Sequence, residues 1–341
     1  LFWYEDDDVI AVASERPPLM STFAAEVDDI RTIEPGHVLV MKRDGRVDHV
    51  PFTEPAELRQ CTFERIYFSR GNDPDIYEER KQLGRNLARP ILESIDHDVE
   101  HAVISYVPNT AESAFFGLVE EVERQVKSHR GDQFWSTVEA GTADLEEFRR
   151  TMNFRVRAEK VAHKDQRLRT FITHDAARRD LVMHIYDITR HVVKPEDTLV
   201  VLDDSIVRGT TLRESIITIL SRLNPRRIIV ASSAPPIMYP DCYGIDMSQL
   251  HRFIAFQAAV ALLEEHGQSD LLEAVEHDCR AQQELSPEEM VNHVGRIYEP
   301  FTLAQIGQKV AELVRPKDVP WDGELNVVYQ DIKGLQDAMP A

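Results

Sequence analysis

Two adjacent acidic residues, Asp203 and Asp204, follow a short apolar run, 199–202, and precede a loop rich in hydroxyl groups. The loop contains Ser205, Ile206, Val207, Arg208, Gly209, Thr210 and Thr211. Its backbone N–H groups, its hydroxyls and a glycine that permits close approach suit a phosphate monoester. The two carboxylates would repel that phosphate, so we expect them to face another part of the ligand, either vicinal hydroxyls or a magnesium ion. Ribose 5-phosphate is the simplest molecule with a phosphate for the loop and vicinal hydroxyls for the two carboxylates.

The segments around this loop predict a parallel sheet. The unbroken apolar run at 199–202 is typical of a strand buried on both faces. Apolar residues then recur at helical spacing from Leu212 to Leu223, and a second buried run, 227–233, follows. Ligands bind at the carboxyl ends of strands in such sheets. The alternative is that the aspartates only end a strand and that Thr210 or Thr211 caps a helix. The loop is neither a P-loop nor a G-x-G-x-x-G turn.

The composition limits the class of protein. A chain of 341 residues can bury a substantial core and is expected to form two structural units. With 59 acidic and 39 basic residues the net charge is −20, which disfavours nucleic acid as a partner. No apolar run reaches the length of a membrane span, and no signal-peptide pattern is present, so no membrane partner is expected.

The cysteines and histidines do not predict a metal centre. Cys61, Cys242 and Cys279 are too few for a disulfide framework and form no C-x-x-C pair, so we expect a reduced, cytoplasmic setting. His184 and His191 could share a helix face, but ordinary histidines are expected there.

The rest of the chain alternates between strand and helix signals. Residues 1 to about 60 predict β-structure, with strands near 8–15 and a hairpin over 37–50. A further strand is predicted at 63–70, and a helix over 75–95 has Leu83, Leu87 and Ile91 on one face. Sequence patterns then predict the following elements: a buried strand at 101–108, helical structure over 118–160, a basic segment at 160–172, a helix at 175–191, helices to about 315, a strand at 325–330 and a helix at 332–339.

Several of these segments resemble the amidophosphoribosyltransferases, also called glutamine phosphoribosylpyrophosphate amidotransferases. The stretch VVLDDSIVRGTT is similar to the phosphoribosylpyrophosphate (PRPP) motif of that family. The resemblance also includes segments at both ends of the chain and is strongest at 61–110 and 169–247.

The resemblance implies an α/β fold of the type I phosphoribosyltransferase class, a twisted parallel sheet flanked by helices. It implies this domain over 61–341, with helical insertions near 118–160 and 255–315. Residues 1–60 are expected to be β remnants of an N-terminal-nucleophile glutaminase domain. By the same resemblance most of that domain is expected to be missing from this chain, which looks cut from something longer. The family uses an N-terminal cysteine as its nucleophile, and position 1 here is Leu.

The implied activity is formation of 5-phosphoribosylamine from PRPP and ammonia with release of pyrophosphate, the first step of purine biosynthesis. By the same resemblance Mg²⁺ would be bound by Thr110, Asp203 and Asp204, while the segment Asp203 to Thr211 would bind PRPP. The catalytic residues would be Lys164, Arg167 and Arg169, which would neutralise the pyrophosphate. This basic loop departs from the family pattern, because it has no glycine and its lysine is one place out of register.

Further partners and cofactors follow from the resemblance alone. Ammonia would come from glutamine through the absent domain, so the chain is expected to use ammonia but not glutamine. Purine nucleotides would be feedback inhibitors, and a homo-oligomer is expected. Some family members hold an iron–sulfur cluster, but no cluster is expected within this chain, because Cys61 and Cys242 have no C-x-x-C partner to complete the ligand set.

Two alternative functions remain at the level of the sequence. One is another type I phosphoribosyltransferase with a nucleobase as acceptor, which the glutaminase-like residues 1–50 disfavour. The other is a non-catalytic PRPP-binding regulator on the same fold, which the net charge of −20 does not support. The sequence leaves open the oligomeric state, the nucleotide sites and the role of 118–160.

Overall fold

The computed structural model describes residues 1–55, 60–164, 186–241 and 247–340. The chain forms two compact units: the first contains residues 1–80 and the C-terminal residues from 339, and the second contains residues 81–338. The assignment of 1–60 to a glutaminase remnant stays a prediction. No helix of the described residues is both long and apolar enough to cross a membrane.

The first unit is built mainly from short antiparallel strands. One sheet has the order β2-β1-β3, and a separate hairpin pairs β4 with β5. The predicted strand near 8–15 and the predicted hairpin are therefore confirmed, and Gly45 lies in the hairpin turn with φ +86°. The elements up to residue 51 are β1 (Phe2–Glu5), β2 (Ile10–Ala13), α1 (Arg16–Phe23), η1 (Val27–Asp29), β3 (Arg31–Thr32), β4 (His37–Met41) and β5 (Val47–Pro51).

The strand predicted at 63–70 is wrong. This segment forms a π-helical turn, η2 (Glu64–Phe68), in which only Ile66 is buried. Phe63 and Tyr67 lie one helical turn apart and their rings stack, with centroids 5.7 Å apart. The aromatic residues suggested a strand, but their contacts follow helical spacing, and among the described residues no strand pairs with this segment.

The predicted helix over 75–95 is interrupted once. It forms α2 (Pro74–Asn86) and α3 (Ala88–Ser94). Pro90 has no N–H group to bond the carbonyl four residues earlier, and its ring crowds that carbonyl, so the first helix ends at Asn86. The three apolar residues predicted on one face, Leu83, Leu87 and Ile91, are all 0% exposed.

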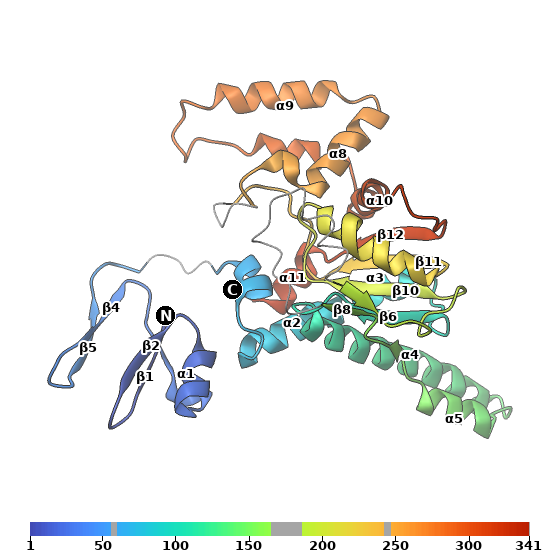
Figure 1. The fold of residues 1–341 in the computed structure, drawn as a ribbon, viewed down its shortest axis with the longest axis horizontal. Coiled ribbons are helices and arrows are strands. Elements are labelled where there is room, and N and C mark those ends of the chain that lie inside the picture. The colour runs from blue at the N-terminus through green and yellow to red at the C-terminus, as the bar shows by residue number, and fades with distance from the viewer. Residues whose placement is uncertain (56–59, 165–185, 242–246, 341) are drawn as a thin grey trace. The chain divides into compact units, whose positions relative to one another are not determined.

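The second unit contains a five-stranded parallel sheet in the order β12-β11-β10-β6-β7 (Figure 1). The strands are β6 (Ala102–Tyr106), β7 (Arg157–Ala158), β10 (Thr198–Asp203), β11 (Arg227–Ser232) and β12 (Glu324–Tyr329). The chain passes from β6 outward to β7, returns to β10 on the other side of β6, and then continues to β11 and β12. The strand order thus reverses between β6 and β10. The predicted α/β fold with a parallel sheet is confirmed.

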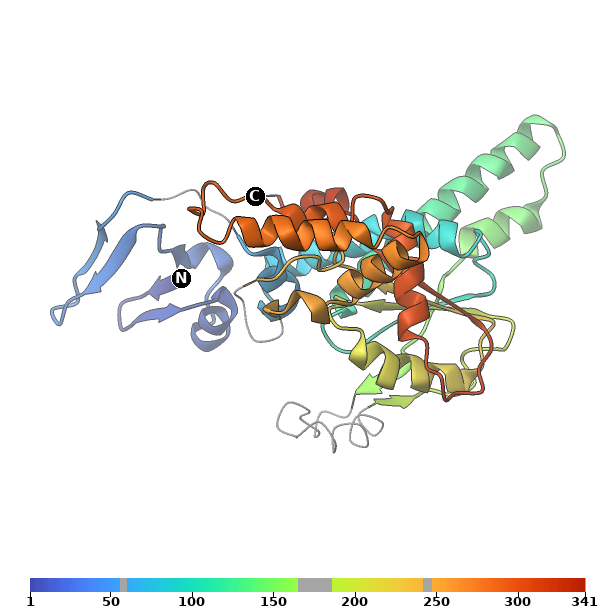
Figure 2. The same cartoon turned by 90° about the horizontal axis from the view of Figure 1, so that it is seen from above.

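Helices cover both faces of this sheet. Leu199 and Val201 point to the face that packs against α8 (Ile254–Glu265), α10 (Leu303–Val314) and the helical segment after β10. Val200 and Leu202 point to the other face, against α3 and α4 (Glu112–Glu139). Because side chains alternate along a strand, an unbroken apolar run is needed only when both faces are buried. Figure 2 shows the helices on the two sides of the sheet.

The helix after β10 has three parts. They are η4 (Leu212–Ile217), α7 (Thr218–Leu220) and η5 (Ser221–Leu223). The predicted helical stripe is confirmed, since Leu212, Ile216, Ile217, Ile219 and Leu220 are buried.

The helical structure predicted over 118–160 is largely present. The long helix α4 (Glu112–Glu139) and the shorter α5 (Leu145–Asn153) form a hairpin. The remaining elements of the second unit are β8 (Ala162–Lys164), β9 (Tyr186–Ile188), η7 (Leu250–Arg252), α9 (Asp270–Ala281), η8 (His293–Ile297) and α11 (Ile332–Ala338).

The helix predicted at 175–191 is wrong at its end. Residues 186–188 form β9, which pairs antiparallel with β8. Tyr186 and Ile188 alternate with the exposed Asp187, and this period of two suits a strand. The earlier part of that predicted helix lies outside the described residues.

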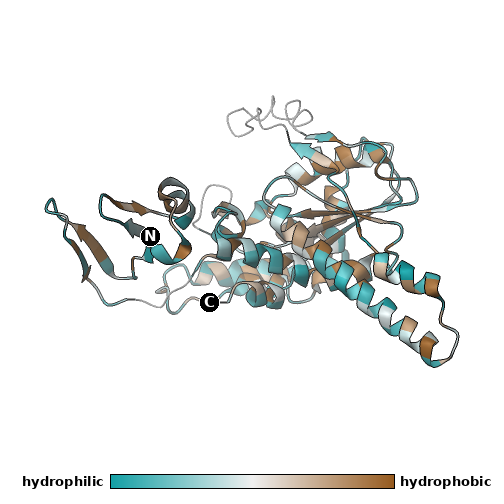
Figure 3. Ribbon diagram, turned by 90° about the horizontal axis from the view of Figure 1, so that it is seen from below, coloured by the Kyte–Doolittle hydropathy of each residue, from teal (hydrophilic) through white to brown (hydrophobic). Residues whose placement is uncertain are grey.

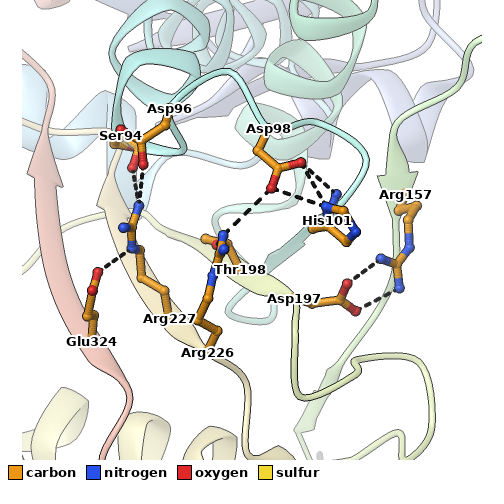
Figure 4. A network of polar contacts seen from close by, with 10 residues as sticks. All are labelled: Ser94, Asp96, Asp98, His101, Arg157, Asp197, Thr198, Arg226, Arg227 and Glu324. Carbon is orange, nitrogen blue, oxygen red and sulfur yellow. Dashed lines mark hydrogen bonds and ion pairs between the residues drawn. The ribbon is translucent and has the colours of Figure 1, made fainter.

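Charged residues connect the amino ends of the strands, opposite the predicted ligand edge (Figure 4). Arg227, at the start of β11, bonds the carbonyl of Ser94 at 2.9 Å and the carboxylates of Asp96 and Glu324 at 3.1 and 2.6 Å. Arg157 binds both carboxylate oxygens of Asp197, at 2.7 and 2.9 Å. The network connects the loops that precede the strands of the parallel sheet.

We expect Asp197→Asn to destabilise the fold by about 1–3 kcal/mol at neutral pH, because the Asp197 side chain is 1% exposed and Arg157 would lose a charged partner. Burial opposes ionisation of Asp197, but hydrogen bonds from Arg157 and from the N–H group of Lys194 outweigh it and lower its pKa. A lowered pKa stabilises the fold above the unfolded-state value of about 4, and this stabilisation is lost as the pH falls through the folded-state value. Urea unfolding of both proteins across this range measures the effect.

The control is Asp96→Asn, which removes a carboxylate of the same network that is 79% exposed. This change should alter stability by less than about 1 kcal/mol. Equal effects of the two substitutions, or a difference that does not shrink in acid, would contradict the account of Asp197.

Candidate active site

The strand order brings two loops of the second unit together. In doubly wound sheets a ligand crevice forms where the order reverses, at the carboxyl ends of the strands. Here the reversal lies between β6 and β10, whose ends are level because Leu202 pairs with Tyr106 and accepts a 2.8 Å hydrogen bond from the N–H group of Val107. The loop with Thr110 follows β6, and the loop with Asp203 to Thr211 follows β10.

The acidic pair lies at the start of the second loop. Asp203 is half-buried, and its carboxylate accepts a 2.9 Å hydrogen bond from the N–H group of Asp204. Ser205 Oγ donates to the Asp204 carboxylate at 3.3 Å. Burial and the neighbouring negative charge of Asp204 raise the pKa of Asp203 well above its ordinary value, and the charge of Lys164 opposes this rise. The pair is therefore held where a cation or hydroxyl donors would stabilise it.

Hydrogen bonds from residues outside the loop fix the backbone of the Asp203–Thr211 loop. Ser233, just after β11, donates its N–H group to the carbonyl of Asp203 at 2.9 Å and its hydroxyl to the carbonyl of Asp204 at 3.2 Å. The N–H group of Ile254 donates to the carbonyl of Val207 at 2.9 Å. The Ile206 side chain is 4% exposed and packs in the core, so only its backbone is available to a ligand.

Gly209 allows the loop to pass close to two helices. Its φ of +69° is in the left-handed region. A Cβ atom at this position would lie 2.8 Å from Val314 Cγ1 of α10 and 3.1 Å from Ile254 Cγ1 of α8. Both the conformation and the space thus require glycine.

The end of the loop is the beginning of a helix. The N–H group of Arg213 bonds the carbonyl of Gly209 at 2.9 Å, so Thr210 and Thr211 occupy the first turn. Both threonines are exposed, and Arg208 before them is half-buried. The N–H groups of a first helical turn point away from the helix and favour an anion.

The first loop contributes Thr110, which is half-buried. Just before it, the hydroxyl of Tyr106 donates to the Glu112 carboxylate at 2.5 Å, and Lys160 Nζ lies 5.9 Å from the centre of the Tyr106 ring. These contacts connect the end of β6 to the first turn of α4. They place a lysine beside this edge of the sheet.

Of the three predicted catalytic residues, one is described. Lys164 ends β8 and is exposed, and its charge acts on Asp203. Arg167 and Arg169 lie outside the described residues.

The oxygen donors at this edge fit a magnesium ion. Mg²⁺ is commonly held by one or two carboxylates together with the phosphates of its substrate. Asp203 and Asp204 supply such carboxylates, and Thr110 supplies a hydroxyl. Within the described part of the chain no cluster of three or more His, Cys, Asp or Glu residues could hold a metal by itself. The donor set therefore suits an ion that arrives with a phosphorylated ligand.

Sequence reasoning missed the residues that hold the loop. Ser233 was part of a predicted strand end, but nothing in the sequence showed that it bonds two carbonyls of the acidic pair. Ile254 and Val314 are more than 40 residues from the loop in sequence, so their packing against Gly209 becomes visible only in the fold.

Comparisons with known proteins find relatives of this chain. The chain is 28% identical over 281 residues to the amidophosphoribosyltransferase of Bacillus subtilis, covering 81% of this chain and 48% of that protein. It is also 28% identical over 235 residues to the enzyme of Pseudomonas aeruginosa, covering 66% of this chain and 39% of that protein. The chain is a distant relative of the amidophosphoribosyltransferases. No family model matches it.

Solved structures support the fold. The glutamine PRPP amidotransferase of B. subtilis, solved in complex with ADP and GMP, matches with a TM-score of 0.55 and 24% identity, over 99% of this chain and 54% of that one. A structure of the allosteric regulatory enzyme of purine biosynthesis matches with a TM-score of 0.56 over 52% of its length. The chain thus spans about half the length of these relatives.

Proposed function

We propose that this chain transfers the 5-phosphoribosyl group of PRPP to ammonia, with release of pyrophosphate. The observation that carries the proposal is the position of the VVLDDSIVRGTT loop at the reversal of strand order, beside the loop that contains Thr110. The distant relationship to amidophosphoribosyltransferases favours ammonia as the acceptor.

Each part of the site has a role in this reaction. The turn from Ser205 to Thr211 binds the 5-phosphate through backbone N–H groups and hydroxyls. Asp203 and Asp204 hold the ribose hydroxyls and, with Thr110, a magnesium ion. When bound, Mg²⁺ would neutralise charge on the pyrophosphate.

The reaction replaces the bond from C1 of the ribose to the pyrophosphate oxygen with a bond from C1 to the ammonia nitrogen. The leaving group carries several negative charges, so cationic side chains favour its departure. Lys164, together with Arg167 and Arg169, supplies these charges in our proposal. Purine nucleotides, which the related B. subtilis structure contains, are proposed inhibitors.

The test is pyrophosphate release from PRPP with Mg²⁺ and ammonium chloride as the only acceptor. We expect release that depends on both additions and stops when the metal is chelated. PRPP binding without any release would instead indicate a regulator that uses the same fold.

A further inference from the structure

An apolar surface at the distal end of the α4–α5 hairpin has no role in the proposed reaction. It consists of Trp135, Val138, Leu145, Phe148 and Met152, which are 62%, 39%, 62%, 41% and 59% exposed. Their exposed area is roughly 500 Å², which is about the size of the largest apolar patch on a typical monomer, and such patches are often functional. We call these five residues the hairpin patch.

The patch lies on helices that are well held. The rings of Phe134 and Phe148 pack across the hairpin with centroids 5.3 Å apart. Asp144 caps α5, since its carboxylate accepts a 3.1 Å hydrogen bond from the N–H group of Glu146. Near the base of the hairpin, the Arg130 guanidinium lies 4.4 Å from the centre of the Phe154 ring.

The hairpin projects away from the sheet of the second unit in both views (Figures 1 and 2). Hydrophobic segments reach its distal end (Figure 3). A second protein can therefore approach the patch without meeting the body of that unit.

The charges beside the patch favour a second copy of the same chain. With 3.6 residues per turn, Leu145, Phe148 and Met152 form one stripe on α5, and Glu146 and Arg149 lie on the same side of that stripe. Both are exposed, and neither forms an ion pair with a described residue. An acidic and a basic side chain are thus left at the edge of an apolar stripe.

A twofold axis between two copies of the chain would place the apolar stripe of one copy against that of the other and bring their opposite charges together. If two α5 helices pack antiparallel, Glu146 lies opposite the partner subunit's Arg149, while Leu145 lies opposite the partner subunit's Met152. Both matches require the same alignment of the helices to within about one helical turn. One alignment therefore pairs the apolar residues and the charges together, as an isologous interface requires.

We propose that the hairpin patch is a dimer interface in which two α4–α5 hairpins pack antiparallel about a twofold axis. The roughly 500 Å² of apolar surface, with its charged edge, approaches the ~800 Å² per partner of a stable interface. The net charge of −20 on each copy opposes association in general, but it is screened over about 8 Å at physiological salt. The five patch residues are apolar, although the Glu139 carboxylate accepts a 3.0 Å hydrogen bond from Trp135 Nε1. With the opposite charges of Glu146 and Arg149 at its edge, this patch is a surface where two copies can meet.

Sedimentation equilibrium of the 341-residue chain at constant salt tests the proposal. We expect a dimer whose dissociation constant rises about tenfold or more in Glu146→Arg and in Arg149→Glu, because each places like charges opposite each other. The double variant exchanges the two charges and should return the constant to within about threefold of the wild type. Leu145→Gln with Met152→Gln tests the apolar stripe without a charge change and should weaken the dimer similarly.

Arg89→Glu is the matched control for Arg149→Glu, because it makes the same charge change on a helix where the side chain is 82% exposed. It should leave the dissociation constant unchanged, and circular dichroism should show all variants folded. A wild-type chain that is monomeric at every concentration would overturn the proposal. A dimer that is insensitive to the single variants would overturn it too, as would a double variant weaker than either single one.

Discussion

Asp203→Asn combined with Asp204→Asn should weaken Mg²⁺-dependent PRPP binding by about 100-fold or more, as measured by titration calorimetry. Neutral amides are poor ligands for a hard dication, and the pair supplies both carboxylates of the site. Because both side chains lie at the carboxyl end of a central strand, no other carboxylate of the Asp203–Thr211 loop can replace them.

The loss of binding should not come from unfolding. Burial and the charge of Asp204 raise the pKa of Asp203, so ionising this carboxyl group is less favourable in the folded state than in the unfolded chain. Replacing it with a neutral amide removes this cost and should keep stability unchanged or raise it by about 1 kcal/mol. A gain in stability together with a loss of binding is the pattern expected of a ligand site.

The control changes another adjacent pair of aspartates, Asp7 and Asp8, which are exposed in the first unit. Asp7→Asn with Asp8→Asn makes the same change in net charge and should leave PRPP affinity unchanged. Unchanged affinity in the Asp203 and Asp204 variant would remove the metal and PRPP assignment.

Gly209→Ala should destabilise the second unit by about 2–4 kcal/mol. The alanine would have to adopt the positive φ of Gly209. Its Cβ atom would also lie 2.8 Å from Val314 Cγ1 and 3.1 Å from Ile254 Cγ1. The backbone strain contributes about 1 kcal/mol and the overpacking about 1–3 kcal/mol. Urea unfolding measures the sum, and PRPP affinity should fall as well because the phosphate loop must shift.

Gly267→Ala is a close control for this prediction. Gly267 has nearly the same φ, +67°, but nothing lies within 4 Å of a Cβ atom placed there. This substitution should therefore cost only the strain, about 1 kcal/mol. If both alanine variants lost the same stability, the contacts with α8 and α10 would not be what requires glycine at position 209.

The central elements of the fold could be predicted from the sequence because their signals are local. The strand at 199–202 is apolar at every position, since both faces of the sheet are covered, and the helix after the loop keeps its apolar spacing. The segment at 63–70 misled because aromatic residues favour strands only when a neighbouring strand is present. At 186–188 only three residues alternate between apolar and polar. This strand signal is too short to stand out from the helical pattern of the sequence before it.

The site could be predicted only in part for a related reason. The acidic pair and the hydroxyl-rich turn are contiguous, so the sequence shows them together. The reversal of strand order between β6 and β10 depends on long-range pairing, and it is what brings Thr110 to the same edge. The bonds from Ser233 and the packing of Ile254 likewise depend on the fold.

The most direct test of the proposed function compares acceptors. Pyrophosphate release from PRPP is measured with Mg²⁺ and, in separate reactions, ammonium chloride, adenine or hypoxanthine. We expect turnover with ammonium alone. Its rate should rise with pH at constant total ammonium, about tenfold per unit while free ammonia is the minor form, because only the free base is a nucleophile. Turnover with a nucleobase but not with ammonium would contradict the account.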